Sequence, residues 1–156
     1  MFDLNIPAYV LSKIYILSFV CAVQCFIIVF IVYSQIDLSI QFGLVYIILL
    51  LCSTGGLTMG LIISSFVNST DKAIALAPIV TIPQIMFSKI MNPVMADFAS
   101  FIEKLMVVKW GLMAIEELKD KYNTNWMELF GYIGVLLAFS ILYSIITIII
   151  LKRKEK

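Results

Sequence analysis

The sequence predicts an all-α membrane protein with four transmembrane helices and an amphipathic or re-entrant external region between the third and the fourth. Hydrophobic residues make up 62% of the 156 residues and charged residues only 13%, whereas soluble domains are about half apolar. Four apolar segments are close to or longer than the roughly 20 residues with which an α-helix crosses a bilayer. They are too long for barrel strands, which need about 10 residues of alternating polarity.

The four predicted spans cover residues 10–33, 42–66, 73–91 and 127–151 of one domain that occupies the whole chain, 1–156. The first has Lys13 near its start and Gln24 in its interior. It is too long for a signal peptide, and no cleavage site of small residues follows it. The fourth ends in the basic sequence KRKEK. The connections between the first three spans are short, and only residues 92–126 form a long one.

Basic residues close to the spans predict the orientation, because they are enriched in cytoplasmic connections. The tail carries Lys152, Arg153, Lys154 and Lys156, and the second connection carries Lys72. The first connection, SQIDLSI, has no basic residue. We therefore expect a multi-pass protein of the plasma membrane with both termini in the cytoplasm.

The second span contains small residues at a four-residue spacing: Cys52, Gly56, Gly60 and Ser64. Small residues on one face let another helix backbone approach closely. We interpret Gly56, Gly60 and Ser64 as a helix-packing ridge. A moving contact in a transporter is the alternative, and the spacing alone does not support it separately.

The third span contains two prolines, Pro78 and Pro83, which each remove a backbone donor and tend to kink a helix. In a membrane such kinks are tolerated mainly inside a helix bundle, where the freed carbonyls find partners. Polar residues share this segment and its end: Thr81, Gln84, Ser88 and Lys89. Two interpretations remain open, a Pro-kinked span with a basic end or a broken, re-entrant piece that lines a cavity or gate.

The external region at 92–126 has a mixed pattern of apolar and charged residues. Apolar side chains recur at helical spacing from Phe98 to Met106 with charges between them. We expect one or two short amphipathic helices at the membrane surface, with Trp110 and Trp126 as interfacial anchors. An ordinary folded loop is the alternative.

Several classes of function are excluded or disfavoured. The net charge is +1 and no basic stripe occurs, which argues against nucleic-acid binding. The chain has no histidine, and its three cysteines lie in apolar runs, where Cys21, Cys25 and Cys52 are expected to be buried apolar residues without a metal. Neither Asp nor Glu lies in a span interior, so an intramembrane enzyme is disfavoured. No GxxxxGKS or GxxxxGKT phosphate loop occurs, so we expect no ATP hydrolysis by this chain.

Three stretches resemble a known family: IPAYVLSK, then GLTMGLIISSFVNSTDKAIALAPIVTIPQIMFSKIMNP, then VVKWGLMAIEEL. Their order and spacing are similar to the second half of ABC exporter permeases of the G, or white-like, subfamily, which are type-2 ABC transporter transmembrane domains. The most specific part runs from Leu61 to Pro93. There, small and polar residues end one span, a short turn follows, and a Pro precedes FS at the end of the next.

The resemblance implies the permease part of an ATP-driven ABC exporter, which moves an amphipathic or hydrophobic substrate by alternating access. It implies a partner nucleotide-binding domain that binds ATP and Mg²⁺, and a second permease copy in a dimer. It also assigns residues to the substrate pathway (Thr81, Gln84, Phe87 and Ser88) and to a gate or plug (Ile90 and Met91). This sequence departs from the family at Lys89, where a Gly usually follows FS.

The resemblance further implies that parts of a transporter are missing. The four segments would be the last four of six spans, yet only nine residues precede Val10. We expect a fragment of a longer transporter, or a split protein whose other parts lie in another chain. The alternative from a different class is a small structural or accessory four-span membrane protein without transport activity of its own.

Overall fold

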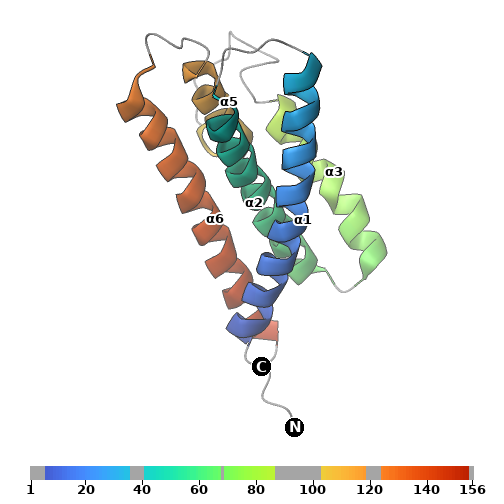
Figure 1. Ribbon diagram of the computed structural model, residues 1–156. Helices are drawn as coiled ribbons and strands as arrows, with labels where there is room; N and C mark the ends of the chain where they lie inside the picture. The colour runs from blue at the N-terminus through green and yellow to red at the C-terminus, as the bar shows by residue number, and fades with distance from the viewer. Residues whose placement is uncertain (1–5, 36–40, 68, 87–102, 119–123, 155–156) are drawn as a thin grey trace.

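The computed structural model describes residues 6–35, 41–67, 69–86, 103–118 and 124–154, and the elements within these ranges are α-helices without any strand. Their bounds are α1 Ile6–Gln35, α2 Phe42–Phe66, α3 Thr70–Met86, α5 Val107–Glu117 and α6 Trp126–Lys154 (Figure 1). This confirms the all-helical class.

Three of these helices, α1, α2 and α6, are long and apolar enough to cross a membrane. They coincide with the first, second and fourth predicted spans, and α2 has the predicted bounds. The helix α3 has 17 residues and ends at Met86. The last part of the third predicted span, 87–91, lies outside the described residues, so the fourth membrane crossing stays a prediction.

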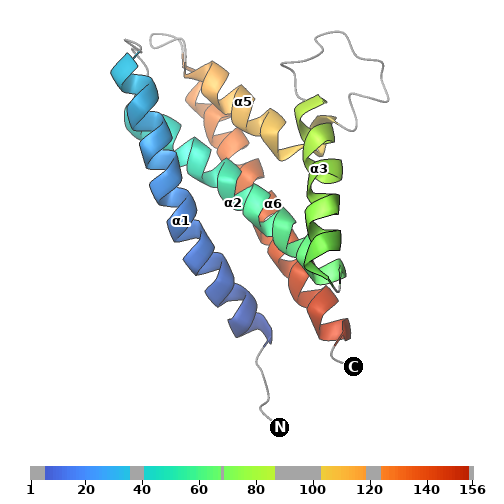
Figure 2. The same ribbon diagram turned by 90° about the vertical axis from the view of Figure 1, so that its right-hand side faces the viewer.

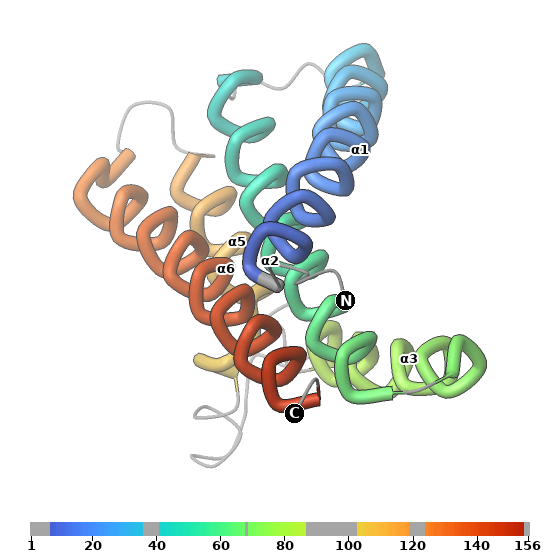
Figure 3. The backbone as a smooth tube through the Cα atoms, turned by 90° about the horizontal axis from the view of Figure 1, so that it is seen from below, coloured from blue at the N-terminus to red at the C-terminus, as the bar shows by residue number. Residues whose placement is uncertain are grey.

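The helix α2 is the centre of the bundle. It contacts α1, α3, α5 and α6, and its largest contact is with α6. The helix α1 packs through a narrow stripe that includes the buried residues Val10, Cys25 and Val29, while most of its other side chains are exposed apolar residues. Seen from below, α3 projects to one side of the other helices (Figure 3). Exposed apolar surface of this extent on α1 is suited to lipid contact.

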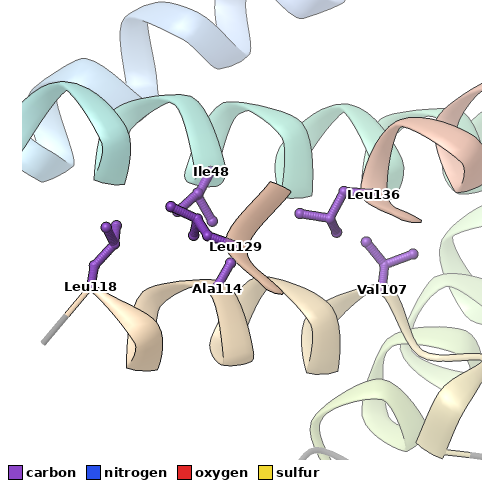
Figure 4. Packing of buried hydrophobic residues seen from close by; sticks show 6 residues of the cluster. All are labelled: Ile48, Val107, Ala114, Leu118, Leu129 and Leu136. Atoms are coloured by element: carbon purple, nitrogen blue, oxygen red, sulfur yellow. The ribbon is translucent and has the colours of Figure 1, made fainter. Parts of the chain in front are cut away.

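The buried core lies where α2, α5 and α6 meet. Figure 4 shows buried side chains directed toward one another from Ile48 of α2, Val107 and Ala114 of α5, Leu118 just after α5, and Leu129 and Leu136 of α6. The helix α5 is short but strongly amphipathic in sequence, and its apolar side faces both long helices. A helix of this length can therefore be fixed by packing although it does not span the bilayer.

The ends of the helices define two ends of the bundle. The start of α1, the end of α2 and the end of α6 lie at one end, together with the start of α3 (Figures 1 and 2). We call this the basic end, because Lys13, Lys72, Lys152, Arg153 and Lys154 lie in its helical termini. The helix α5 lies toward the opposite end (Figure 2).

Candidate functional site

The helix α3 carries the two predicted kinks. Pro78 and Pro83 both lie inside the helix, and each lacks the N–H that would bond to the carbonyl four residues earlier. The carbonyls of Ile74 and Ile79 thus lose their helical donors. No residue of α3 is buried, and its isoleucines are exposed. The combination gives a helix without buried residues, in which two carbonyls lack the usual donor four residues later.

Two of the predicted pathway residues lie on this helix with different environments. The Gln84 side-chain amide donates to the Met59 sulfur of α2 over 2.7 Å, so Gln84 faces the neighbouring helix. The Thr81 hydroxyl is exposed and donates to the Ala77 carbonyl of its own helix at 2.8 Å. Phe87, Ser88, Ile90 and Met91 lie outside the described residues. A pathway formed by all six residues therefore stays a prediction.

Three polar side chains in the middle of α2 donate to carbonyls of their own helix. Ser53 donates to the Leu50 carbonyl, Thr54 to the Leu51 carbonyl, and Thr58 to the carbonyls of Thr54 and Gly55. Across the helices, the Cys25 thiol donates to the Ser53 hydroxyl at 3.6 Å. Such hydroxyls can lie inside an apolar bundle because their donors are already used. They add polarity near α1 without a free hydrogen bond donor.

Close helix approach occurs at two glycines that the spacing argument did not select. A Cβ on Gly55 of α2 would lie 2.9 Å from Val107 Cγ1 and 3.7 Å from Ser140 Oγ. A Cβ on Gly111 of α5 would overlap the Cys52 sulfur. Gly55 and Gly111 thus allow α2 and α5 to meet closely.

The predicted packing ridge has a different environment. Nothing described lies within 4 Å of a Cβ built on Gly56 or Gly60, and Ser64 is exposed. Its role in packing stays a prediction, and any neighbour would come from outside the described residues.

An ion pair fixes the chain just before α5. Lys109 Nζ lies 3.1 Å from Glu103 Oε1, with side-chain exposures of 11% and 16%. The Trp110 indole N–H donates to the Lys104 carbonyl at 2.9 Å. These contacts tie the turn at 103–106 to α5. The sequence suggested an amphipathic helix here, but it did not indicate that one of its lysines is buried.

Clusters of metal-ligating side chains are absent from the described parts of the chain. Within those residues, no three histidine, cysteine or acidic side chains lie close enough together to hold a metal ion. The three cysteines have free thiols. What the geometry offers is a packed pair of spans with a more loosely attached, proline-containing helix beside it.

Comparison with known families identifies this arrangement. A family model described as ABC-2 type transporter matches residues 2–118, which include α1, α2, α3 and α5. The chain belongs to the ABC-2 type transporter family. No curated protein and no solved structure matches the chain significantly.

As an ABC-2 type transporter domain, the chain is a membrane-embedded transporter permease, and such domains generally pair with ATP-binding subunits. The predicted type-2 ABC family is therefore confirmed. The matched residues end at the C-terminal end of α5, so α6 lies beyond the matched part. The ABC-2 match includes every predicted site residue, on α2, on α3 and in the stretch 87–91 that lies outside the described residues.

Proposed function

We propose that the chain is the C-terminal four-span portion of a G, or white-like, exporter permease, which moves an amphipathic or hydrophobic substrate by alternating access. ATP and Mg²⁺ are bound by a partner nucleotide-binding domain, and two permease copies enclose the pathway. The family match over residues 2–118 carries this proposal. The substrate class is the one that the resemblance to white-like exporters implies.

The weak attachment of α3 supports its part in the pathway. Its side chains are all at least partly exposed, and its one described side-chain hydrogen bond to another helix joins Gln84 to a sulfur atom, a weak acceptor. Thr81 and Gln84 can offer hydrogen bonds to a polar substrate group. Alternating access needs a helix that can move relative to a fixed neighbour, and α3 beside the well-packed α2 meets this need.

The distribution of charge supports the proposed orientation in the plasma membrane. The basic end carries Lys13, Lys72 and the last turn of α6. Toward the opposite end, Lys104 and Lys109 are accompanied by acidic residues such as Glu103 and Glu128. By the positive-inside rule, the basic end with both termini faces the cytoplasm. Cysteine labelling of a Ser12→Cys variant from each side of sealed vesicles tests this orientation.

The central test is purification of the full chain from its native membrane in mild detergent. We expect a chain with a phosphate loop to co-purify, and the complex to hydrolyse ATP after reconstitution into liposomes. Recovery of an autonomous bundle without an ATP-binding partner would contradict the proposal and favour the accessory-protein alternative. Dimerisation is measured on the same sample by its mass in solution.

A second experiment tests the pathway residues in the reconstituted complex. Thr81→Val and Gln84→Leu remove polar groups at nearly constant volume, so we expect altered substrate-stimulated ATPase activity and export. Ile82→Val is the matched control, because Ile82 is an exposed apolar residue of the same helix. If both polar variants kept export and stimulated hydrolysis unchanged, the pathway assignment would be wrong.

A further inference from the structure

A cavity of about 190 Å³ lies at the basic end, between α1, α2 and α6. Its lining includes Tyr9 and Lys13 of α1, Ser64 and Ser65 of α2, and Thr147 of α6. Lys13 is seven residues into α1, which places it about 10 Å along the helix from its first residue. This depth is close to the boundary between the apolar part of a bilayer and its headgroups.

The lining has the chemistry of an anion site. Among the described residues that line it, Lys13 is the one charged residue and none is acidic. Lys13 lies over the Tyr9 ring, with Nζ 4.7 Å from the ring centroid, and makes no salt bridge with any described residue. The Ser64 hydroxyl has no hydrogen bond partner among the described residues. An ammonium group and a free hydroxyl thus face the same cavity.

Two further hydroxyls are buried in the cavity wall. Thr147 is 1% exposed and Ser65 is 5% exposed. They donate to the Tyr143 and Ile62 carbonyls respectively, and rotation about Cβ–Oγ can redirect either proton. A lysine with several hydroxyl donors, and no carboxylate among the described lining residues, suits a phosphate oxygen, because charge-assisted hydrogen bonds are the strong ones.

The surroundings favour a negatively charged group. Lys72, Lys152 and Arg153 belong to the same end of the bundle, whereas Asp71 is the one acidic side chain in its described ranges 6–13, 61–67, 69–74 and 147–154. A volume of about 190 Å³ is several times the roughly 30 Å³ that one water occupies in the liquid. The cavity is therefore large enough for a phosphate group and its ester oxygens. The apolar side chains of Val10 and Leu61 complete the lining.

We propose that this cavity binds the phosphate group of an anionic phospholipid from the adjacent leaflet, with Lys13 as the main anchor. The lipid tails then lie along the face of α1 that continues from Lys13, where Ile16, Leu17 and Val20 are exposed. Since the described lining residues include no carboxylate, they offer nothing to the ammonium group of a zwitterionic lipid. The site therefore prefers phosphatidylglycerol to phosphatidylcholine. This preference does not depend on the transport proposal.

Native mass spectrometry of the full chain tests the proposal. The chain is incubated with phosphatidylglycerol or phosphatidylcholine, and bound lipid is counted as detergent is removed. We expect one tightly bound phosphatidylglycerol per chain and about tenfold weaker binding for Lys13→Gln, since a charge-assisted contact is lost. Lys13→Arg should retain binding. Lys72→Gln is the matched control, because it removes the same charge at the same end without lining the cavity.

Specific outcomes overturn the proposal. Equal weakening by Lys13→Gln and Lys72→Gln would show a diffuse charge effect instead of a site. Equal retention of the two lipids by the unaltered chain would exclude the preference. Inorganic phosphate and glycerol 3-phosphate are added as competitors. If either displaced the lipid and bound as tightly without it, the site would belong to a soluble phosphate and the lipid assignment would be wrong. Thr147→Val, which keeps the side-chain shape, should weaken binding while circular dichroism reports an unchanged helix content.

Discussion

The contact at Gly55 gives a quantitative test of the packing between α2, α5 and α6. In Gly55→Ala the new methyl carbon would lie 2.9 Å from Val107 Cγ1, about 0.6 Å or more inside ordinary carbon–carbon contact. Val107 cannot easily rotate away, because it is β-branched and its Cγ2 atom is also only 3.7 Å from the new carbon. Overpacking of this kind costs about 1–3 kcal/mol.

The neighbouring residue supplies a matched control on the same helix. Gly56 has nothing described within 4 Å of a built Cβ, so Gly56→Ala should show only the gain in helix propensity of about 1 kcal/mol. Gly55→Ala has the same gain but also the overlap. We therefore expect the two variants to differ by about 1–3 kcal/mol in free energy of unfolding, with Gly55→Ala the less stable.

Unfolding by sodium dodecyl sulfate in mixed micelles, followed by tryptophan fluorescence, measures this difference. A double-mutant cycle with Val107→Ala identifies the cause, because it removes Cγ1 and Cγ2. Gly55→Ala should cost less in the Val107→Ala background than in the unaltered chain, by about 1 kcal/mol or more. Equal stability of Gly55→Ala and Gly56→Ala would refute the overlap. Absence of coupling to Val107→Ala would mean that another contact dominates.

Three further predictions concern α5 and α3 and use the same unfolding assay. Glu103→Gln leaves the buried Lys109 without its carboxylate partner and should destabilise the chain by about 3 kcal/mol. The double variant Glu103→Gln with Lys109→Met should recover most of this loss. Trp110→Phe removes the bond to the Lys104 carbonyl and should cost about 1 kcal/mol; a loss below measurement error would show that the bond is replaced by water. Gln84→Leu should change the free energy of unfolding by less than about 1 kcal/mol, because polar contacts between helices in a membrane average about 0.6 kcal/mol. A larger loss would mean that α3 is more firmly fixed than its exposure indicates.

The long helices could be predicted because their signal is local. An unbroken apolar run of more than 20 residues leaves few alternatives in a membrane, and the predicted bounds of α2 coincide with the observed ones. The ends of α1 and α6 extend beyond the prediction to Ile6 and Lys154. Helices continue beyond an apolar run when their backbone bonds allow it, so hydropathy marks the apolar core of a helix better than its termini.

The close contacts could not be predicted, because they depend on which face of a helix meets its neighbour. The four-residue spacing selected Gly56 and Gly60, yet the observed approach is at Gly55, one residue earlier and about 100° around the helix. A central helix such as α2 has neighbours on several sides, and a pattern of small residues does not say which side is which. Likewise, the partner of Gly111 is Cys52, and nothing local to either residue indicates that pairing.

The more apolar of two helices is not the more firmly packed one here, and this difference bears on the proposed transport cycle. The short helix α5 cannot span a bilayer, but four of its residues, Val107, Lys109, Gly111 and Ala114, are buried against the long helices or in the ion pair. The helix α3 is longer and more apolar, yet it buries no residue and has two prolines. Moving α5 would disrupt the core at Ile48 and Leu136. Moving α3 would disrupt its contacts with α2 and α5, which include the Gln84–Met59 hydrogen bond but no buried residue of α3. Among the described helices, the packing therefore favours displacement of α3 over displacement of α5.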